Sequence, residues 1–315
     1  MAKRDRVWHP KPHRAVEYNE KAIQKVIDQY GYILVSPKVD GIRALIRRVG
    51  DTVSVTTREG IEILSLARMG RQLREEFDRK LPSTPGIVAD CEIFIADVPF
   101  DESSGILRRN SPLADVYDLR IAVFDVTFEN VITGEGTDSE ELAGRVARYW
   151  PAGGELDTDC MYLLPTHDCA DLDHVRRFFQ YYREAGLEGL IIKHPMLSYR
   201  NGKVSGWWKM KPEITEDGVV TGYVWGEEGK ANEGKIVGFE VELESGETVR
   251  ATGLTREAME DYTELAFLDE FTGQVEPIIG RYCEVKAMER TASGKLRHPH
   301  FKCWRDLEGA EGVKS

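Results

Sequence analysis

The sequence predicts an α+β protein in two parts: a larger part of antiparallel sheets and helices, followed by a small, mostly β part. Residues 1–212 alternate short apolar runs with amphipathic helical patterns, which is typical of an α+β domain. After Lys211-Pro212 the pattern changes to short strands of alternating polarity around one helix. The length of 315 residues suits one large or two ordinary domains.

In the larger part, the predicted helices end near proline or glycine. They cover residues 64–80, residues 139–149 with Ser139 as the N-cap, and residues 172–185 with Gly186 as the C-cap. The strand candidates are short apolar runs at 32–35, 53–57, 87–95, 121–126 and 190–192. The polar stretch 99–117 predicts a long loop between them.

In the smaller part, residues 218–315, five short strands surround one predicted helix. The strands are expected at 219–225, 236–243, 247–251, 281–287 and 296–304, and the helix at 255–265 with Thr255 as its N-cap. This pattern suits a Greek-key β-barrel of the OB type, although a β-sandwich fits it as well. Residues 213–217 are the expected linker.

The net charge of −12 argues mildly against a polyanionic partner, but the charge is segregated. Residues 213–264 carry −10, whereas the stretch from Lys286 to Asp306 carries +4. A local basic track is enough to neutralise phosphates. No apolar stretch approaches the ~18–20 residues of a membrane span, so we expect no membrane partner. The five scattered cysteines lack metal-site spacing and favour a reducing cytoplasm.

Lys38 follows the apolar run 32–35 and precedes a turn that Pro37 and Gly41 predict. A lysine acts as a nucleophile when burial or nearby cations lower its pKa, and Arg43 lies five residues further on. An isolated Lys-x-Asp-Gly sequence is more often a surface lysine beside a turn. The segments further along the chain change that interpretation.

Those segments together suggest a nucleotide site. Arg58 sits at a strand-to-turn junction, and Asp90 and Glu92 offer the oxygen ligands that Mg²⁺ needs. Phe124 interrupts an apolar strand, where an aromatic ring is more often core than a platform for a base. Two later strand candidates also carry charged residues. Glu188 and Lys193 bracket the first. Lys209 and Lys211 lie on the second, and their i, i+2 spacing predicts that they share one strand face.

No P-loop or G-x-G-x-x-G sequence occurs, so the phosphates are expected to meet side-chain cations. The order K-x-D-G-x-R, R-x-G, acidic-x-E, aromatic-Asp, E-G-x-I-x-K and W-x-K-x-K closely resembles the covalent nucleotidyltransferases. That superfamily contains DNA ligases, RNA ligases and mRNA capping enzymes. The stretches 206–212, 232–236 and 293–299 look most like the short ATP-dependent DNA ligases of bacteriophages, which have an adenylation domain and an OB domain.

The resemblance implies a role for each matching residue. Lys38 would attack the α-phosphate of ATP and form a lysyl–AMP intermediate, and AMP would pass to the 5′-phosphate of a nick in duplex DNA before the nick is sealed. Arg43 and Arg58 would hold the ribose and later the nick phosphate. The remaining roles are adenine stacking by Phe124 and Ile191, binding of Mg²⁺ or Mn²⁺ by Glu92 and Glu188, with Glu92 also near the sugar, and phosphate neutralisation by Lys209 and Lys211 with Lys193 nearby.

DNA contacts are expected from Lys295, Arg297, Lys302 and Arg305, and the resemblance implies a monomer. The sequence departs from the pattern at Ser36, where many ligases carry a glutamate that reads the adenine amino group. Two alternatives remain open at this point. One is an RNA ligase or a GTP-using capping-type enzyme, and the other is a non-catalytic OB protein that binds DNA through phosphate contacts and base stacking.

Overall fold

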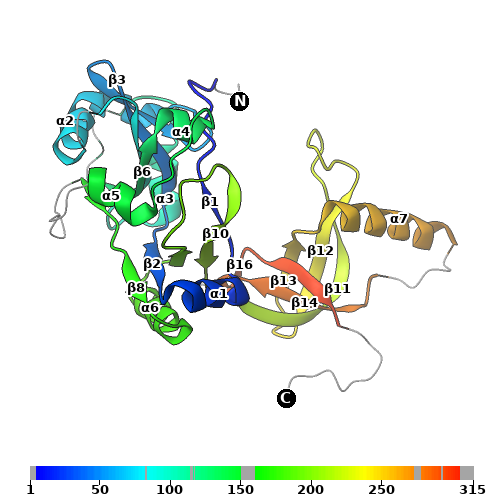
Figure 1. Ribbon diagram of the computed structural model, residues 1–315. Helices are drawn as coiled ribbons and strands as arrows, with labels where there is room; N and C mark the ends of the chain where they lie inside the picture. The colour runs from blue at the N-terminus through cyan, green and yellow to red at the C-terminus, as the bar shows by residue number, and fades with distance from the viewer. Residues whose placement is uncertain are drawn as a thin grey trace. The chain divides into compact units, whose positions relative to one another are not determined.

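The computed structural model describes residues 5–81, 84–113, 116, 118–149, 160–272, 278–291 and 294–305. The chain divides into two compact units, Met1–Met210 and Lys211–Ser315 (Figure 1). In the described ranges, no helix combines the length and the hydrophobicity of a membrane-spanning segment.

The first unit contains two five-stranded sheets. One has the order β4-β3-β5-β6-β7 and is antiparallel except for the β6–β7 pair. Its strands are β3 (Ile42–Val49), β4 (Thr52–Thr57), β5 (Ile87–Ile95), β6 (Leu119–Phe128) and β7 (Met161–Leu163). The largest apolar core of the unit joins this sheet to η1 (Leu64–Met69) and α2 (Gly70–Lys80), with α3 (Phe100–Leu107) beside them.

The second sheet has the order β1-β10-β9-β2-β8, with β1 and β10 parallel and the other pairs antiparallel. Its strands are β1 (Arg14–Glu17), β2 (Ile33–Lys38), β8 (His167–Cys169), β9 (Gly189–Lys193) and β10 (Lys203–Met210). The helices α1 (Glu20–Tyr30) and α6 (Leu172–Glu184) pack on it through a shared apolar core (Figure 1). Two shorter helices, α4 (Glu129–Thr133) and α5 (Leu142–Tyr149), complete the unit.

Several predicted elements differ from the observed ones. The predicted loop 99–117 contains α3, and the predicted helix 64–80 is a 3₁₀ helix up to Met69 that continues as α2. The helix predicted from Ser139 begins at Leu142. The third predicted helix ends at Glu184 with Ala185 as its C-cap, and the left-handed Gly186 (φ 81°) follows one residue later.

Helix α1 was not predicted, although its boundaries obey simple rules. The Asn19 side chain accepts a hydrogen bond from the Ala22 amide at 3.0 Å, and Gly31 closes the helix with φ 80°. Ile23, Val26 and Ile27 form its buried face at helical spacing. The helix leads directly into β2 and so helps to position Lys38.

The second unit is a closed five-stranded barrel of order β11-β12-β13-β17-β14, which confirms the predicted OB-type barrel over a sandwich. Phe239 lies at the centre of its core, with Tyr262, Phe301 and Trp304 around its ring. The elements are β11 (Ile214–Trp225), β12 (Ile236–Leu243), β13 (Thr248–Thr252), α7 (Arg256–Thr272), β14 (Tyr282–Ala287), β15 (Glu289–Arg290), β16 (Leu296–Arg297) and β17 (His300–Trp304).

Three predictions for this unit were wrong in detail. Strand β11 already begins at Ile214 and pairs with β14 from that residue, so residues 214–217 belong to the barrel and not to a linker. The single strand predicted at 296–304 is divided into β16 and β17, because His298 adopts a positive φ of 53° and Pro299 follows it. The helix predicted at 255–265 extends to Thr272 as α7.

Candidate active site

A cavity of about 370 Å³ in the first unit contains most of the site residues that the sequence predicts. It is lined by residues from both sheets, which come from distant parts of the chain. The predicted residues on its wall are Lys38, Arg43, Arg58, Glu92, Phe124, Ile191, Lys193 and Lys209. Glu188 and Lys211 are not on the wall.

Lys38 is the last residue of β2, and its register partner in β9 is Gly189. This pairing places Glu188, the residue just before β9, beside the lysine. The Lys38 ammonium donates a hydrogen bond to Glu188 Oε2, and the two side chains are 21% and 6% exposed. A nearly buried carboxylate therefore holds the ammonium at the edge of the cavity.

Gly41 lets β3 begin close to β5. A Cβ at this position would lie 2.7 Å from the Ile93 carbonyl oxygen and 2.8 Å from Glu92 Cγ. Because only glycine fits there, Arg43 and Glu92 become register partners across β3 and β5. The turn after Lys38 thus brings the lysine, the arginine and Glu92 to the same cavity.

Arg43 is held in one orientation by Asp90. Its Nε and Nη2 donate to the two carboxylate oxygens of Asp90 at 2.9 and 2.6 Å, and the Tyr199 hydroxyl donates to the same carboxylate at 3.2 Å. Burial opposes the charge of Arg43, but Asp90 outweighs it, so the pKa of Arg43 lies above its ordinary value. The guanidinium lies 5.2 Å from the centroid of the Phe124 ring.

Glu92 is an acidic residue on the cavity wall. Burial raises the pKa of Glu92 to about 7, against the opposing charges of Lys38 and Arg43, while Asp90 and Glu188 add to the rise. Within the described ranges, no three His, Cys, Asp or Glu side chains gather in a way that would hold a metal. Two carboxylates nevertheless suit Mg²⁺, which is usually held by one or two carboxylates together with waters and substrate phosphates.

Phe124 reaches the cavity because of a β-bulge. Asp90 pairs with Asp125 and Cys91 with Val123, so Phe124 is the extra residue on β6. Val123 and Val126 both lie in the apolar core, which leaves Phe124 and Asp125 for the other side of the strand. Without the bulge, strict alternation would send adjacent residues to opposite faces.

Ile191 and Lys193 follow Glu188 on β9 and line the same cavity. The Lys193 ammonium donates to the Phe124 carbonyl oxygen at 3.5 Å and lies 4.9 Å from the centroid of the Trp207 ring. Burial lowers the pKa of Lys193 to about 8, although Asp125 and Asp90 oppose this shift. Phe124, Ile191 and Trp207 make this part of the wall apolar, as a planar base requires.

Cations supply the rest of the wall. Lys209 forms an ion pair with Glu17 at 2.8 Å, and Arg58 is 53% exposed beside Glu59. Arg14 and Lys203, which the sequence analysis did not select, are register partners on β1 and β10 and also line the cavity. The i, i+6 spacing of Lys203 and Lys209 on one strand face is a signal that would have found Lys203.

The sequence analysis predicted that Lys209 and Lys211 share one face of a strand, and the structure does not place them so. Strand β10 ends at Met210, and Lys211 belongs to the second unit, where its ammonium lies 3.9 Å from Met288 Sδ. The four predicted DNA-binding residues also belong to the second unit. Ion pairs join Arg297 to Glu289 at 3.2 Å, Lys302 to Glu284 at 3.4 Å, and Arg305 to Asp217 and Glu284 at 2.8 and 3.2 Å, while Lys295 is exposed.

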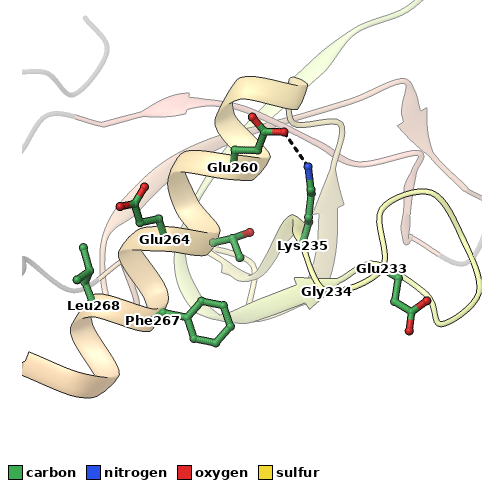
Figure 2. Close-up of a pocket in the computed structure, with 8 residues that line it drawn as sticks. Glu233, Gly234, Lys235, Glu260, Glu264, Phe267 and Leu268 are labelled. Atoms are coloured by element: carbon green, nitrogen blue, oxygen red, sulfur yellow. Dashed lines mark hydrogen bonds and ion pairs between the residues drawn. The ribbon is translucent and has the colours of Figure 1, made fainter.

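A second cavity lies in the barrel unit, between α7 and the start of β12 (Figure 2). Glu233, Glu260 and Glu264 line it, and its one lysine, Lys235, is paired with Glu260 at 2.7 Å. Three carboxylates repel a triphosphate. The first cavity, where several cations line the wall, is therefore the better candidate for an anionic ligand.

Comparisons with known proteins identify the family of the chain. The family model for the ATP dependent DNA ligase domain matches residues 12–211, and that for the DNA ligase C-terminal domain matches residues 212–305. The DNA ligase of Escherichia phage T7 is 30% identical, with 94% of this chain and 96% of the relative covered. The DNA ligase of Enterobacteria phage T3 is also 30% identical, with 96% and 97% covered.

Among solved structures, the ATP-dependent DNA ligase from bacteriophage T7 in complex with ATP is similar to this chain. It has a TM-score of 0.54 and 29% sequence identity, with 94% of this chain and 98% of that chain covered. The two family models together span both units of the structure. The chain therefore belongs to the ATP-dependent DNA ligases.

Proposed function

We propose that Lys38 is the nucleophile of this ligase and that the cavity around it binds ATP, with sealing of nicks in duplex DNA as the overall reaction. The main support for the proposal is that Lys38 lines the same cavity as several cationic side chains and a group of apolar ones. Cations suit the phosphates of ATP, and the apolar surface suits its base. Positioning and charge stabilisation are the main work of a protein in such transfers.

In the first step, the deprotonated amine of Lys38 forms a bond to the α-phosphorus of ATP. The bond from that phosphorus to the bridging oxygen breaks, and pyrophosphate leaves. The Lys38 ammonium must first lose a proton, and its hydrogen bond to Glu188 keeps it at the cavity edge until then. Lys209 and Arg58 lie on the same wall, where they neutralise phosphate charge.

In the second step, the 5′-phosphate of the nick attacks the phosphorus of lysyl–AMP and releases Lys38. In the third step, the 3′-hydroxyl attacks the 5′-phosphate, and AMP leaves with the electrons of the broken anhydride bond. Each step places a phosphorus near the same lysine and the same cations. Arg43, which Asp90 holds in a fixed direction, serves first the ribose and then the nick phosphate.

Glu92 and Glu188 are the residues that would hold Mg²⁺ or Mn²⁺. Burial of Glu92 makes its charge costly without a cation nearby, which fits such a role. A metal ion held by these two carboxylates would supply positive charge near the phosphate oxygens. Phe124 and Ile191 are the apolar residues that we assign to stacking on the adenine ring.

The proposal assigns the nucleotide chemistry to residues 1–212 and DNA contacts to the barrel, residues 218–315. Lys295, Arg297, Lys302 and Arg305 are the barrel cations offered to the DNA, whereas Lys211 is offered to the phosphates. A monomer is sufficient, because one chain lines the whole nucleotide cavity. All five cysteines are free thiols, which suits the cytoplasm, or the host cytoplasm if a phage encodes the protein.

Self-labelling with ATP radioactive at the α-phosphate tests the nucleophile. We expect Lys38→Ala to abolish covalent labelling while the fold survives, because the bond to AMP is proposed to form at Lys38 and not at the other lysines of the cavity wall. Lys21→Ala, which removes an exposed lysine from α1, is the matched control and should label normally. Undiminished label on Lys38→Ala would remove Lys38 from the role of nucleophile.

A further inference from the structure

Ser36 presents a buried hydroxyl to the nucleotide cavity that no protein group satisfies. Its side chain is 0% exposed, and Oγ has no hydrogen-bond partner among the described residues. A buried hydroxyl without a partner destabilises a fold, so such a group calls for an explanation in ligand binding.

Ser36 lies on the wall of the cavity that we propose binds the nucleotide. Ser36 and Lys38 are two residues apart on β2, so both side chains leave the strand on the same face, and both line the cavity. The register partner of Ser36 on β9 is Ile191, and Ile191 and Phe124 form the apolar part of the same wall. Ser36 therefore lies beside the surface assigned to the base.

The chemistry of a hydroxyl defines what this contact recognises. A serine hydroxyl both donates and accepts, whereas a carboxylate only accepts. The C6 substituent of adenine is an amino group, a donor, and that of guanine is a carbonyl oxygen, an acceptor. We propose that the Ser36 hydroxyl hydrogen-bonds the C6 substituent of the bound purine and supports ATP and GTP alike.

This inference rests on the proposed function and adds to it a statement about specificity. Ser36 contributes affinity for the base without choosing adenine, so the preference for ATP comes from other groups in the cavity. Replacing Ser36 by glutamate would introduce an acceptor that favours the amino group and repels the carbonyl oxygen. The serine thus makes the site more permissive towards 6-oxopurines than an acidic residue would.

The test compares the kcat/KM of self-labelling with ATP, GTP and purine riboside triphosphate, which carries only hydrogen at C6. In the unmodified protein, kcat/KM should be about fivefold to tenfold lower with purine riboside triphosphate than with ATP. Ser36→Ala should lower the values for ATP and GTP by that factor and leave purine riboside triphosphate unchanged. Ser36→Glu should raise the ratio of ATP to GTP by about tenfold or more.

A matched serine separates the base contact from a general packing effect. Ser65 is also 0% exposed, but its hydroxyl donates to the Leu107 carbonyl oxygen at 2.6 Å, away from the cavity. Without nucleotide, Ser36→Ala should keep or raise the midpoint of thermal unfolding, whereas Ser65→Ala should lower it by about 2–4 °C. Ser65→Ala should keep the ratios among the three nucleotides.

Two results would overturn the role of Ser36. One is an equal loss for all three nucleotides in Ser36→Ala, and the other is an unchanged advantage of ATP over purine riboside triphosphate in that variant. Neither result bears on the nucleophile. Normal labelling of Lys38→Ala would instead overturn the proposed function, so the two failures are distinguishable.

Discussion

Burial changes the pKa of several side chains near the cavity and so decides whether they carry a charge. His13 is a clear example. Its ring is 1% exposed, stacks on Trp207 with centroids 4.6 Å apart, and donates from Nε2 to the Val204 carbonyl oxygen at 3.2 Å. Burial lowers the pKa of His13 to about 4, although the Val204 carbonyl opposes the shift. The imidazole is therefore neutral in the folded protein near neutral pH.

This burial predicts a pH dependence of stability. The unfolded chain takes up a proton on His13 below about pH 6.5, while the folded chain resists it until about pH 4. The contribution of His13 to the free energy of unfolding is thus complete above pH 6.5. It is lost as the pH falls towards 4, which lowers the free energy of unfolding by roughly 2–3 kcal/mol. His13→Gln, whose amide does not titrate and still donates to Val204, should show a shallower loss.

Urea unfolding of both proteins between pH 7.5 and pH 4.5 measures the difference. Titration of the many carboxylates affects both proteins equally, so subtracting one curve from the other isolates the histidine. Parallel curves across this range would mean that His13 is protonated as readily in the folded chain as in the unfolded one.

At the scale of elements, a buried ion pair fixes α5 against the bulged strand β6. Arg145 on α5 donates from Nε and Nη2 to the carboxylate of Asp125 at 3.1 and 2.8 Å, and the two side chains are 1% and 0% exposed. Arg145 also donates to the carbonyl oxygens of Glu140 and Leu197. Since Asp125 directly follows Phe124, we expect this pair also to support the Phe124 ring.

We expect Arg145→Met to lower the free energy of unfolding by about 3–5 kcal/mol, because it leaves the Asp125 carboxylate buried without its partner. Arg145→Met combined with Asp125→Leu should recover part of this loss, since no unpaired charge remains. Arg176→Met, which breaks an exposed ion pair with Glu20, is the control and should change stability little. Equal losses in the single and double variants would show that charge pairing is not the cause.

At the scale of the whole molecule, charge and chemistry are divided between the two units. The net charge of −12 is an average over regions of opposite charge. Several cations line the cavity of the first unit, and the barrel unit contains both an acidic stretch and a basic one. Lys209 lies on the wall of the cavity in the first unit, and Lys211 lies in the barrel unit. The two lysines of one short motif therefore belong to different units.

We expect Lys209→Ala to slow self-labelling about 100-fold, because it removes one of the cations on the cavity wall. Both Lys209→Ala and Lys211→Ala should impair the sealing of pre-adenylylated nicks more than they impair DNA binding. Lys235→Ala, taken from the acidic cavity of Figure 2, should leave both activities unchanged. If both variants seal such nicks at the normal rate and lose only affinity for DNA, neither lysine serves the phosphates.

The helical and strand patterns predicted the α+β class, the barrel and most strands, because periodicity reports which face of an element is buried. They missed α1, although the residues that cap it, Asn19 and Gly31, are visible in the sequence. They also missed α3, in which the Ser103 hydroxyl oxygen accepts a hydrogen bond from the Ile95 amide of β5 at 2.9 Å. That contact exists only after folding.

The sequence by itself determined the type of chemistry, since Lys38, its ordered partners and the departure at Ser36 are visible in the order of residues. The tertiary structure decided which of these residues meet. The bulge at Phe124, the bond of Asp90 to Arg43 and the separation of Lys211 from Lys209 all depend on register and strand ends. Register arises from pairing between segments far apart in the chain, and no local pattern of residues contains it.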